Sequence, residues 1–203
     1  GPEEMSTGDA PRRLGNEYLF QMLAQQNIET MNGYGVKKIV TNCPHSHNAL
    51  AHEYPEFGGD YEVVHGTQLV AELVRAGKIK LTGSLSMDLA YHDPCYLGRT
   101  NDVYDAPRFL LKAIPGVRVR EAELHRETSM CCGAGGGRMW LEEDQGERIN
   151  QTRFSQLEES GTSDVAVACP YCFSMLSDAQ NELGREDASA YDVIELVAKS
   201  LEG

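Results

Sequence analysis

The sequence is poor in features that would assign it to three classes of protein. No apolar run approaches the ~18 residues that cross a bilayer, so these residues predict no membrane-spanning helix. The first residues are polar and do not resemble a signal peptide. Lys and Arg number 18 against 31 Asp and Glu, so the chain lacks the basic stripe of a nucleic-acid-binding protein. We therefore expect no nucleic-acid partner.

The composition is that of a globular protein with several cysteines. Hydrophobic residues make up 41% of the 203 positions and charged residues 24%, which is typical of one large folded domain or two small ones. Disulfide-rich scaffolds are usually short and secreted, and this chain does not resemble them. Its six cysteines are therefore interpreted as reduced thiols that bind a metal or take part in redox chemistry.

An internal repeat organises the chain. Residues 36–50 resemble residues 164–176, because each stretch is a β-branched run that ends in Cys-Pro before a helix-like segment. Further along, residues 61–74 resemble residues 190–201 at nearly the same spacing. The second copy is preceded by a strand-like and helix-like region, residues 88–120, that the first copy lacks. The sequence therefore predicts a complete second copy and a truncated first copy.

The repeat predicts the domain organisation and the fold class. We expect residues 3–82 to form a degenerate, truncated first repeat, and residues 83–203 to form a complete second repeat that holds the site. Alternating strands and helices indicate an α/β fold of two related Rossmann-like βα units with mainly parallel sheets. The expected strands are 36–42, 61–65, 88–92, 117–121 and 164–168, and the expected helices are 14–31, 47–54, 67–76, 105–114, 139–159, 171–181 and 191–201.

Five of the cysteines follow expected strands of the second copy. They are Cys95, the adjacent pair Cys131 and Cys132, and the Cys-x-x-Cys pair Cys169 and Cys172. Because the carboxyl ends of parallel strands meet at one edge of a sheet, we expect these thiols to lie together. One zinc ion takes four ligands and would leave a thiol unused, whereas an iron–sulfur centre suits dense thiolate ligation. A structural zinc on four of the five cysteines stays open as an alternative.

The residues around these thiols suit a metal–sulfur centre. A run of glycines begins at Gly133, and it lets backbone N–H groups approach the sulfur atoms closely. Cys169 and Cys172 lie at an expected helix start, which favours the thiolate form. We expect Arg99 and Arg138 to offset the negative charge of the centre.

The pattern Cys95…Cys131-Cys132-Gly133…Cys169-Pro-x-Cys172 resembles the cysteine-rich CCG domain of heterodisulfide reductases and related iron–sulfur oxidoreductases. The resemblance implies a non-cubane [4Fe-4S] cluster held by these five cysteines, which an isolated fragment can lose or exchange for zinc. Residues 7–20 and 91–98 look most like a bacterial membrane-bound group of this family, which links electron-transfer flavoprotein to menaquinone.

The resemblance also implies a place for the chain in a larger oxidoreductase. It would be the cytoplasmic cluster-binding domain, held at the cytoplasmic face of the membrane by other parts of the parent protein. Its expected partners are electron-transfer flavoprotein or another redox protein, and the membrane and ferredoxin-type portions of the parent chain, with menaquinone reached indirectly. The isolated chain is not expected to complete a turnover. A non-catalytic zinc-binding docking module and a disulfide-reducing subunit like heterodisulfide reductase are the alternatives.

The first copy departs from the family pattern. Ser6 and Thr7 stand where the adjacent cysteine pair would be, and Ser46 replaces the second cysteine of Cys-Pro-x-Cys. Only Cys43 remains of the ligand set, so we expect that the first copy holds no cluster and that Cys43 is not a ligand.

The histidines allow several interpretations. His45 and His47 do not share a helix face, and we expect them at a polar helix start beside the site. His92 precedes Asp-Pro-Cys95, where it is either a proton donor or partner of the ligands, or a packing residue at a strand end. His65 and His125 are expected to be exposed to solvent.

Overall fold

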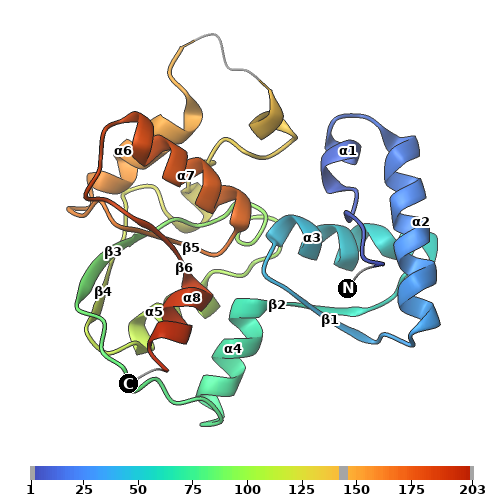
Figure 1. Ribbon diagram of the computed structural model, residues 1–203, viewed down its shortest axis with the longest axis horizontal. Coiled ribbons are helices and arrows are strands. Elements are labelled where there is room, and N and C mark those ends of the chain that lie inside the picture. The colour runs from blue at the N-terminus through green and yellow to red at the C-terminus, as the bar shows by residue number, and fades with distance from the viewer. Residues whose placement is uncertain (1–2, 142–145, 202–203) are drawn as a thin grey trace.

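The computed structural model describes residues 3–141 and 146–201 as an α/β fold with two parallel sheets (Figure 1). The larger sheet has the strand order β4-β3-β5-β6. The smaller sheet pairs β1 with β2 and lies on the side of α1 and α2. The predicted fold class is confirmed. The strands are β1 (Lys38–Thr41), β2 (Glu62–His65), β3 (Met87–Tyr91), β4 (Val117–Arg120), β5 (Val165–Val167) and β6 (Ala190–Asp192).

The helices lie around the two sheets. The chain after α3 continues through a π-helical turn at Ala49–Glu53 and a 3₁₀ turn at Tyr54–Phe57. Two further 3₁₀ turns lie at Arg126–Thr128 and Arg138–Trp140. The α-helices are α1 (Asp9–Arg13), α2 (Glu17–Gly33), α3 (Pro44–Asn48), α4 (Gly66–Arg75), α5 (Asp105–Ala113), α6 (Ile149–Glu158), α7 (Pro170–Glu182) and α8 (Val193–Lys199).

The two sequence copies contain the same succession of elements. The first runs β1-α3-β2-α4 and the second runs β5-α7-β6-α8, with parallel pairing of the two strands in each. Cys43 and Cys169 are the N-cap residues of α3 and α7, and a proline opens each helix. Proline is favoured at this position because its φ angle suits the helix and its missing N–H is not needed there.

Three expected helices differ from the structure. The helix expected at 191–201 starts only after Asp192, whose side chain caps α8 by accepting the N–H of Ile194, and the preceding residues pair with β5 as β6. The helix expected at 14–31 is interrupted where Asn16 caps α2. The helix expected at 139–159 begins at Ile149, and residues 142–145 of that range lie outside the described residues.

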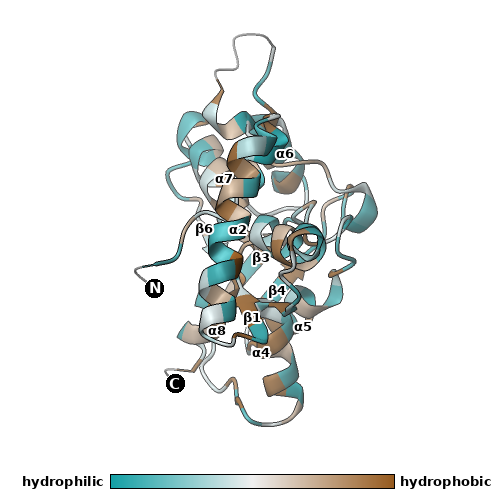
Figure 2. Cartoon of the chain, turned by 90° about the vertical axis from the view of Figure 1, so that its right-hand side faces the viewer, coloured by the Kyte–Doolittle hydropathy of each residue, from teal (hydrophilic) through white to brown (hydrophobic). Residues whose placement is uncertain are grey.

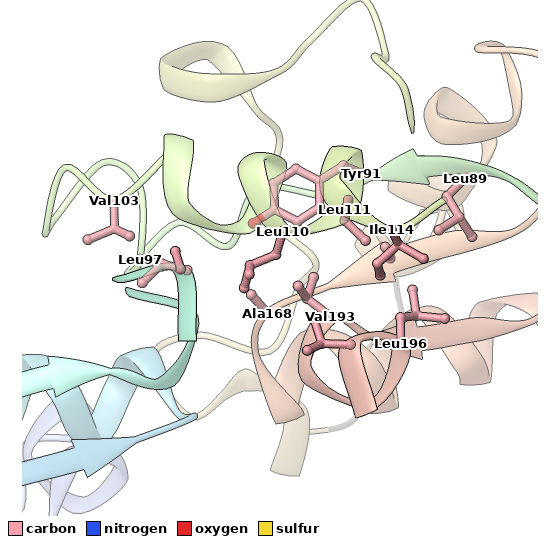
Figure 3. Packing of buried hydrophobic residues seen from close by; sticks show 13 residues of the cluster. Leu89, Tyr91, Leu97, Val103, Leu110, Leu111, Ile114, Ala168, Val193 and Leu196 are labelled. Carbon is pink, nitrogen blue, oxygen red and sulfur yellow. The ribbon is translucent and has the colours of Figure 1, made fainter. Parts of the chain in front are cut away.

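The larger sheet is covered on both faces. Leu89 and Tyr91 of β3 point to one face, where they pack with α5 and α8 (Figure 3). Ala90 points to the other face, where it packs with α6 and α7. Ala71 of α4 belongs to the α5–α8 side, so a helix of the first copy completes the core of the second. A third cluster joins α2 to the smaller sheet through Phe20 and other buried residues.

The helices carry hydrophilic residues among the hydrophobic ones (Figure 2). Within residues 3–141 and 146–201, no helix is both long and apolar enough to cross a bilayer.

Candidate metal–sulfur site

Three loops of the second copy bring five cysteines together. Cys95 follows β3 after His-Asp-Pro, and Cys169 and Cys172 lie at the start of α7 directly after β5. Cys131 and Cys132 come from the segment after the 3₁₀ turn at Arg126–Thr128. The sequence predicted this meeting from the position of each cysteine relative to the strands, although its role in ligation stays a prediction.

The five sulfur atoms form a continuous row, here called the thiol row. Cys95 hydrogen-bonds to Cys131, and Cys131 to its neighbour Cys132. Cys132 in turn contacts Cys172, which hydrogen-bonds to Cys169. The last three are buried, whereas Cys95 and Cys131 are half-buried. All five are free thiols, so they are available to a metal.

The thiol row contains two thiols that favour the thiolate. Hydrogen bonds from Cys132 and Cys95 lower the pKa of Cys131, against the opposing effect of burial. Burial alone would raise the pKa of Cys169, but hydrogen bonds from the Cys172 side chain and backbone outweigh it. The hydrogen bond to Cys131 raises the pKa of Cys132 to about 12. Acceptors and donors thus alternate along part of the row.

Gly133 brings its backbone close to the row. Its N–H donates to the Sγ atom of Cys131 at 3.3 Å, and its φ angle is +93°. A Cβ atom there would lie 3.2 Å from Ile149 and 3.3 Å from Met175. The position therefore requires glycine for both conformation and space.

His92 lies beside the inner cysteines. One of its ring nitrogens and the Sγ atoms of Cys132 and Cys172 all lie within 4.8 Å of one another. Its Nδ1 accepts a hydrogen bond of 3.1 Å from Nε of Arg153, and its Nε2 is buried without a hydrogen-bond partner among the described residues. Of the two interpretations of His92, the structure supports that of a partner to the site.

Buried ion pairs hold the loops that carry the thiols. Both guanidinium Nη atoms of Arg108 donate to Asp93, at 2.6 and 2.7 Å. The same carboxylate accepts the backbone N–H of Arg126 at 2.7 Å. Arg99 donates to the backbone carbonyl of Ser129, next to the adjacent cysteine pair. The segments before Cys95 and before Cys131 are thereby fixed to one another.

The first copy contributes His45 to the edge of the site. Its Nδ1 lies 2.9 Å from a carboxylate oxygen of Asp9, and both side chains are buried. The ring stacks on Tyr96 at 4.3 Å and tilts against Tyr171 at 4.7 Å. Those tyrosines are neighbours of cysteines in the thiol row. The expected position of His45 beside the site is therefore confirmed.

Two other features of the site were predicted wrongly or missed. His65 was expected in solvent but is 1% exposed, because β2 ends against the second copy and its ring caps α4. Arg153 and the Asp93–Arg108 pair were not identified. An arginine within a helix ordinarily indicates an exposed face, so no sequence signal distinguishes these two from surface arginines.

The donor set fits an iron–sulfur group. Five contiguous sulfur atoms supply soft ligands, and two of them favour the thiolate form that metal binding requires. A backbone N–H already points at one sulfur, as is common around clusters, and a buried polar nitrogen without a partner lies beside two others.

Comparison with known proteins agrees with this chemistry. The family model described as Cysteine-rich domain (CCG) matches residues 5–51 and 89–177. The chain is 51% identical over its whole length to a probable iron-sulfur-binding oxidoreductase, FadF, of Bacillus subtilis, and spans 29% of it. It is 48% identical over its whole length to the EtfAB:quinone oxidoreductase of Syntrophomonas wolfei, and again spans 29%.

A more distant relative comes from an archaeon. The dihydromethanophenazine:CoB–CoM heterodisulfide reductase of Methanosarcina barkeri contains a polypeptide that is 36% identical over 99% of this chain and 50% of its own length. The chain therefore spans half or less of the length of these three relatives.

Proposed function

The chain belongs to the CCG family of cysteine-rich domains, and from this premise we propose that it relays electrons through one non-cubane [4Fe-4S] cluster within a larger oxidoreductase. The observation that carries the proposal is the unbroken row of five thiols, which includes an adjacent pair. A cubane cluster uses four cysteine ligands, so a fifth cysteine in the same row favours a more open arrangement.

In this proposal Cys95, Cys131, Cys132, Cys169 and Cys172 hold the cluster. When bound, the cluster supplies one-electron redox chemistry, which no side chain of the thiol row provides by itself. The chain's own residues would position the sulfur atoms and exclude water from the inner three. Gly133 would stabilise negative charge on sulfur through its N–H, as it does for Cys131 in the structure.

We also propose the direction of the relay and its setting. The name of the Syntrophomonas wolfei relative includes a quinone, which supports a route from an electron-transfer flavoprotein or another redox protein toward menaquinone. Because the chain spans 29% of that relative, membrane and ferredoxin-type portions of a parent protein would complete the route at the cytoplasmic face. Within the chain, residues 3–82 would be the degenerate first repeat and residues 83–203 the repeat that holds the cluster.

Metal analysis after anaerobic expression and reconstitution tests the proposal. We expect a brown protein with equal amounts of iron and acid-labile sulfide, whose visible spectrum bleaches with dithionite. The control is Cys132→Ser, which removes a buried member of the thiol row and should lose most of the iron. A colourless protein with one tightly bound zinc under the same conditions would instead support a zinc-binding docking module.

A further inference from the structure

His92 stands apart from the five cysteines but is enclosed with them. Its side chain is 0% exposed, and the same holds for its hydrogen-bond partner Arg153. The Arg153 guanidinium also donates to the Leu124 carbonyl, to Gln156 and to Ser129, at 3.1 to 3.3 Å. Arg153 is therefore held in one orientation, with its Nε–H directed at Nδ1 of His92.

This contact determines where the imidazole carries its proton. Arginine can only donate hydrogen bonds, so Nδ1 of His92 must offer its lone pair. A neutral imidazole has one N–H, which must then lie on Nε2. Burial lowers the pKa of His92 to about 3, and the charge of Arg153 acts in the same direction, so the ring is neutral near pH 7.

The Nε2–H group needs an acceptor. It is buried and has no hydrogen-bond partner among the described residues, and a buried donor without a partner is costly. The sulfur atoms of Cys132 and Cys172 lie within 4.8 Å of the ring nitrogen that faces them. Sulfur that carries negative charge, whether thiolate or cluster sulfide, accepts hydrogen bonds from N–H groups.

We propose that His92 donates a hydrogen bond through Nε2–H to sulfur of the metal–sulfur centre and is not a metal ligand, with Arg153 as the positioning residue that sets its tautomer. The inference rests on the proposed iron–sulfur function. A histidine that binds a metal usually donates its other N–H to a carboxylate or carbonyl, whereas here that nitrogen faces a donor. Binding through Nε2 would place a proton on Nδ1, directly against the N–H of Arg153.

The hydrogen bond has an electrical consequence. When one electron is added, negative charge on the sulfur atoms increases, and the N–H group stabilises that charge without giving up its proton. No bond is made or broken in this step. His92 should therefore raise the reduction potential of the centre, and a variant that lacks the donor should be harder to reduce.

The tautomer can be measured without any metal. In the metal-free chain labelled with ¹⁵N-histidine, we expect NMR to show His92 protonated at Nε2 only. Arg153→Met should give a mixture of tautomers, whereas the exposed control Arg118→Met should leave the spectrum of His92 unchanged. A proton on Nδ1 of His92 in the unmodified chain would overturn the proposal.

The role toward the centre is tested with two variants of the reconstituted chain. His92→Phe removes the donor at similar volume, and His92→Gln keeps an N–H donor near the position of Nε2. Both should keep the iron, and only His92→Phe should shift the reduction equilibrium, by about tenfold or ~59 mV for one electron. Loss of iron from both variants to the level of Cys132→Ser would make His92 a ligand. An unchanged potential in His92→Phe would also overturn the proposal.

The two hypotheses can fail separately. A chain that binds zinc alone would overturn the proposed electron-relay function. The nitrogen spectrum of the metal-free chain would still decide whether Arg153 fixes the proton of His92 on Nε2.

Discussion

Cys43 and Cys169 cap equivalent helices, yet their surroundings differ. Cys169 hydrogen-bonds to Cys172, whereas Ser46 stands at the position of that partner in the first copy. Burial raises the pKa of Cys43, and the charge of Cys169 raises it further. Cys43 thus lies near the thiol row but favours the neutral thiol, which is a poor metal ligand.

We predict that Cys43→Ser leaves the iron content of the reconstituted chain unchanged. The matched comparison is Cys169→Ser, which alters the equivalent helix cap within the thiol row and should lower the iron content strongly. Iron and sulfide analysis of both variants, prepared side by side, checks this. Equal losses from both would show that the first copy supplies a ligand.

The glycine run offers a second test at single residues. Gly133→Ala should destabilise the chain by about 1–3 kcal/mol, because alanine is strained at positive φ. The added Cβ atom would also lie 3.2 Å from Ile149. Gly135→Ala is the control, since the nearest atom to its Cβ is on His45 at 4.0 Å. Urea unfolding should show a clear loss for the first variant and little change for the second.

Single residues show what the sequence could predict about the site. The meeting of five cysteines follows from their positions after parallel strands, a rule that needs no knowledge of packing. The contact of His45 with Asp9 and the burial of His65 depend on how the two copies pack against each other. That arrangement is set by contacts between distant residues, which no local pattern contains.

At the scale of elements, β2 and α4 meet at a buried histidine. Nδ1 of His65 accepts the N–H of Thr67, and Gln68 completes the capping box of α4. Burial lowers the pKa of His65 to about 4, partly offset by hydrogen bonds to the backbone of Asn42 and Ala168. The folded chain therefore holds this ring neutral in a range where an unfolded chain would protonate it.

We predict that stability falls as the pH is lowered from about 6.5 to 4. In that range the unfolded state binds a proton at His65 that the folded state does not, so unfolding is favoured, by up to ~3 kcal/mol at the lower end. His65→Asn keeps a good helix cap without a titrating group, and it should flatten the profile. The measurement is urea unfolding across this range, and parallel profiles would contradict the assignment.

The element boundaries show where sequence patterns succeed. The strands β1 to β5 lie within the expected ranges or one residue from them, because their β-branched and alternating runs are clear. β6 was missed since it has three residues and merges into the apolar pattern of α8. A strand this short is defined by its pairing with β5 rather than by its own sequence.

At the scale of the whole molecule, the two copies share a core. Ala71 of α4 is fully buried with residues of α5 and α8, and Val70 and Val74 pack against the same cluster. The linking segment also returns to the second copy, because the N–H groups of Thr82 and Gly83 both donate to the carbonyl of Ser200. The copies are thus related in sequence but interdependent in structure.

This predicts the result of a cut between the copies. Lys78 and Lys80 are exposed in the segment after α4, and limited trypsin treatment should cleave there. The two fragments should elute together on size-exclusion chromatography and separate only under denaturing conditions, because α4 stays packed against α5 and α8. Fragments that elute apart without denaturant would show that the shared core contributes little.

The smaller sheet has a consequence for handling the protein. Among the described residues, β1 pairs with β2 alone, so its other edge presents unpaired backbone groups, and Val40 beside them is 47% exposed. Such an edge is a template onto which another extended segment can be added. In concentrated solution, neighbouring molecules are expected to stack through this edge, opposed by the charge of Lys38. Samples for spectroscopy or crystallisation should therefore be most prone to turbidity when salt screens that charge.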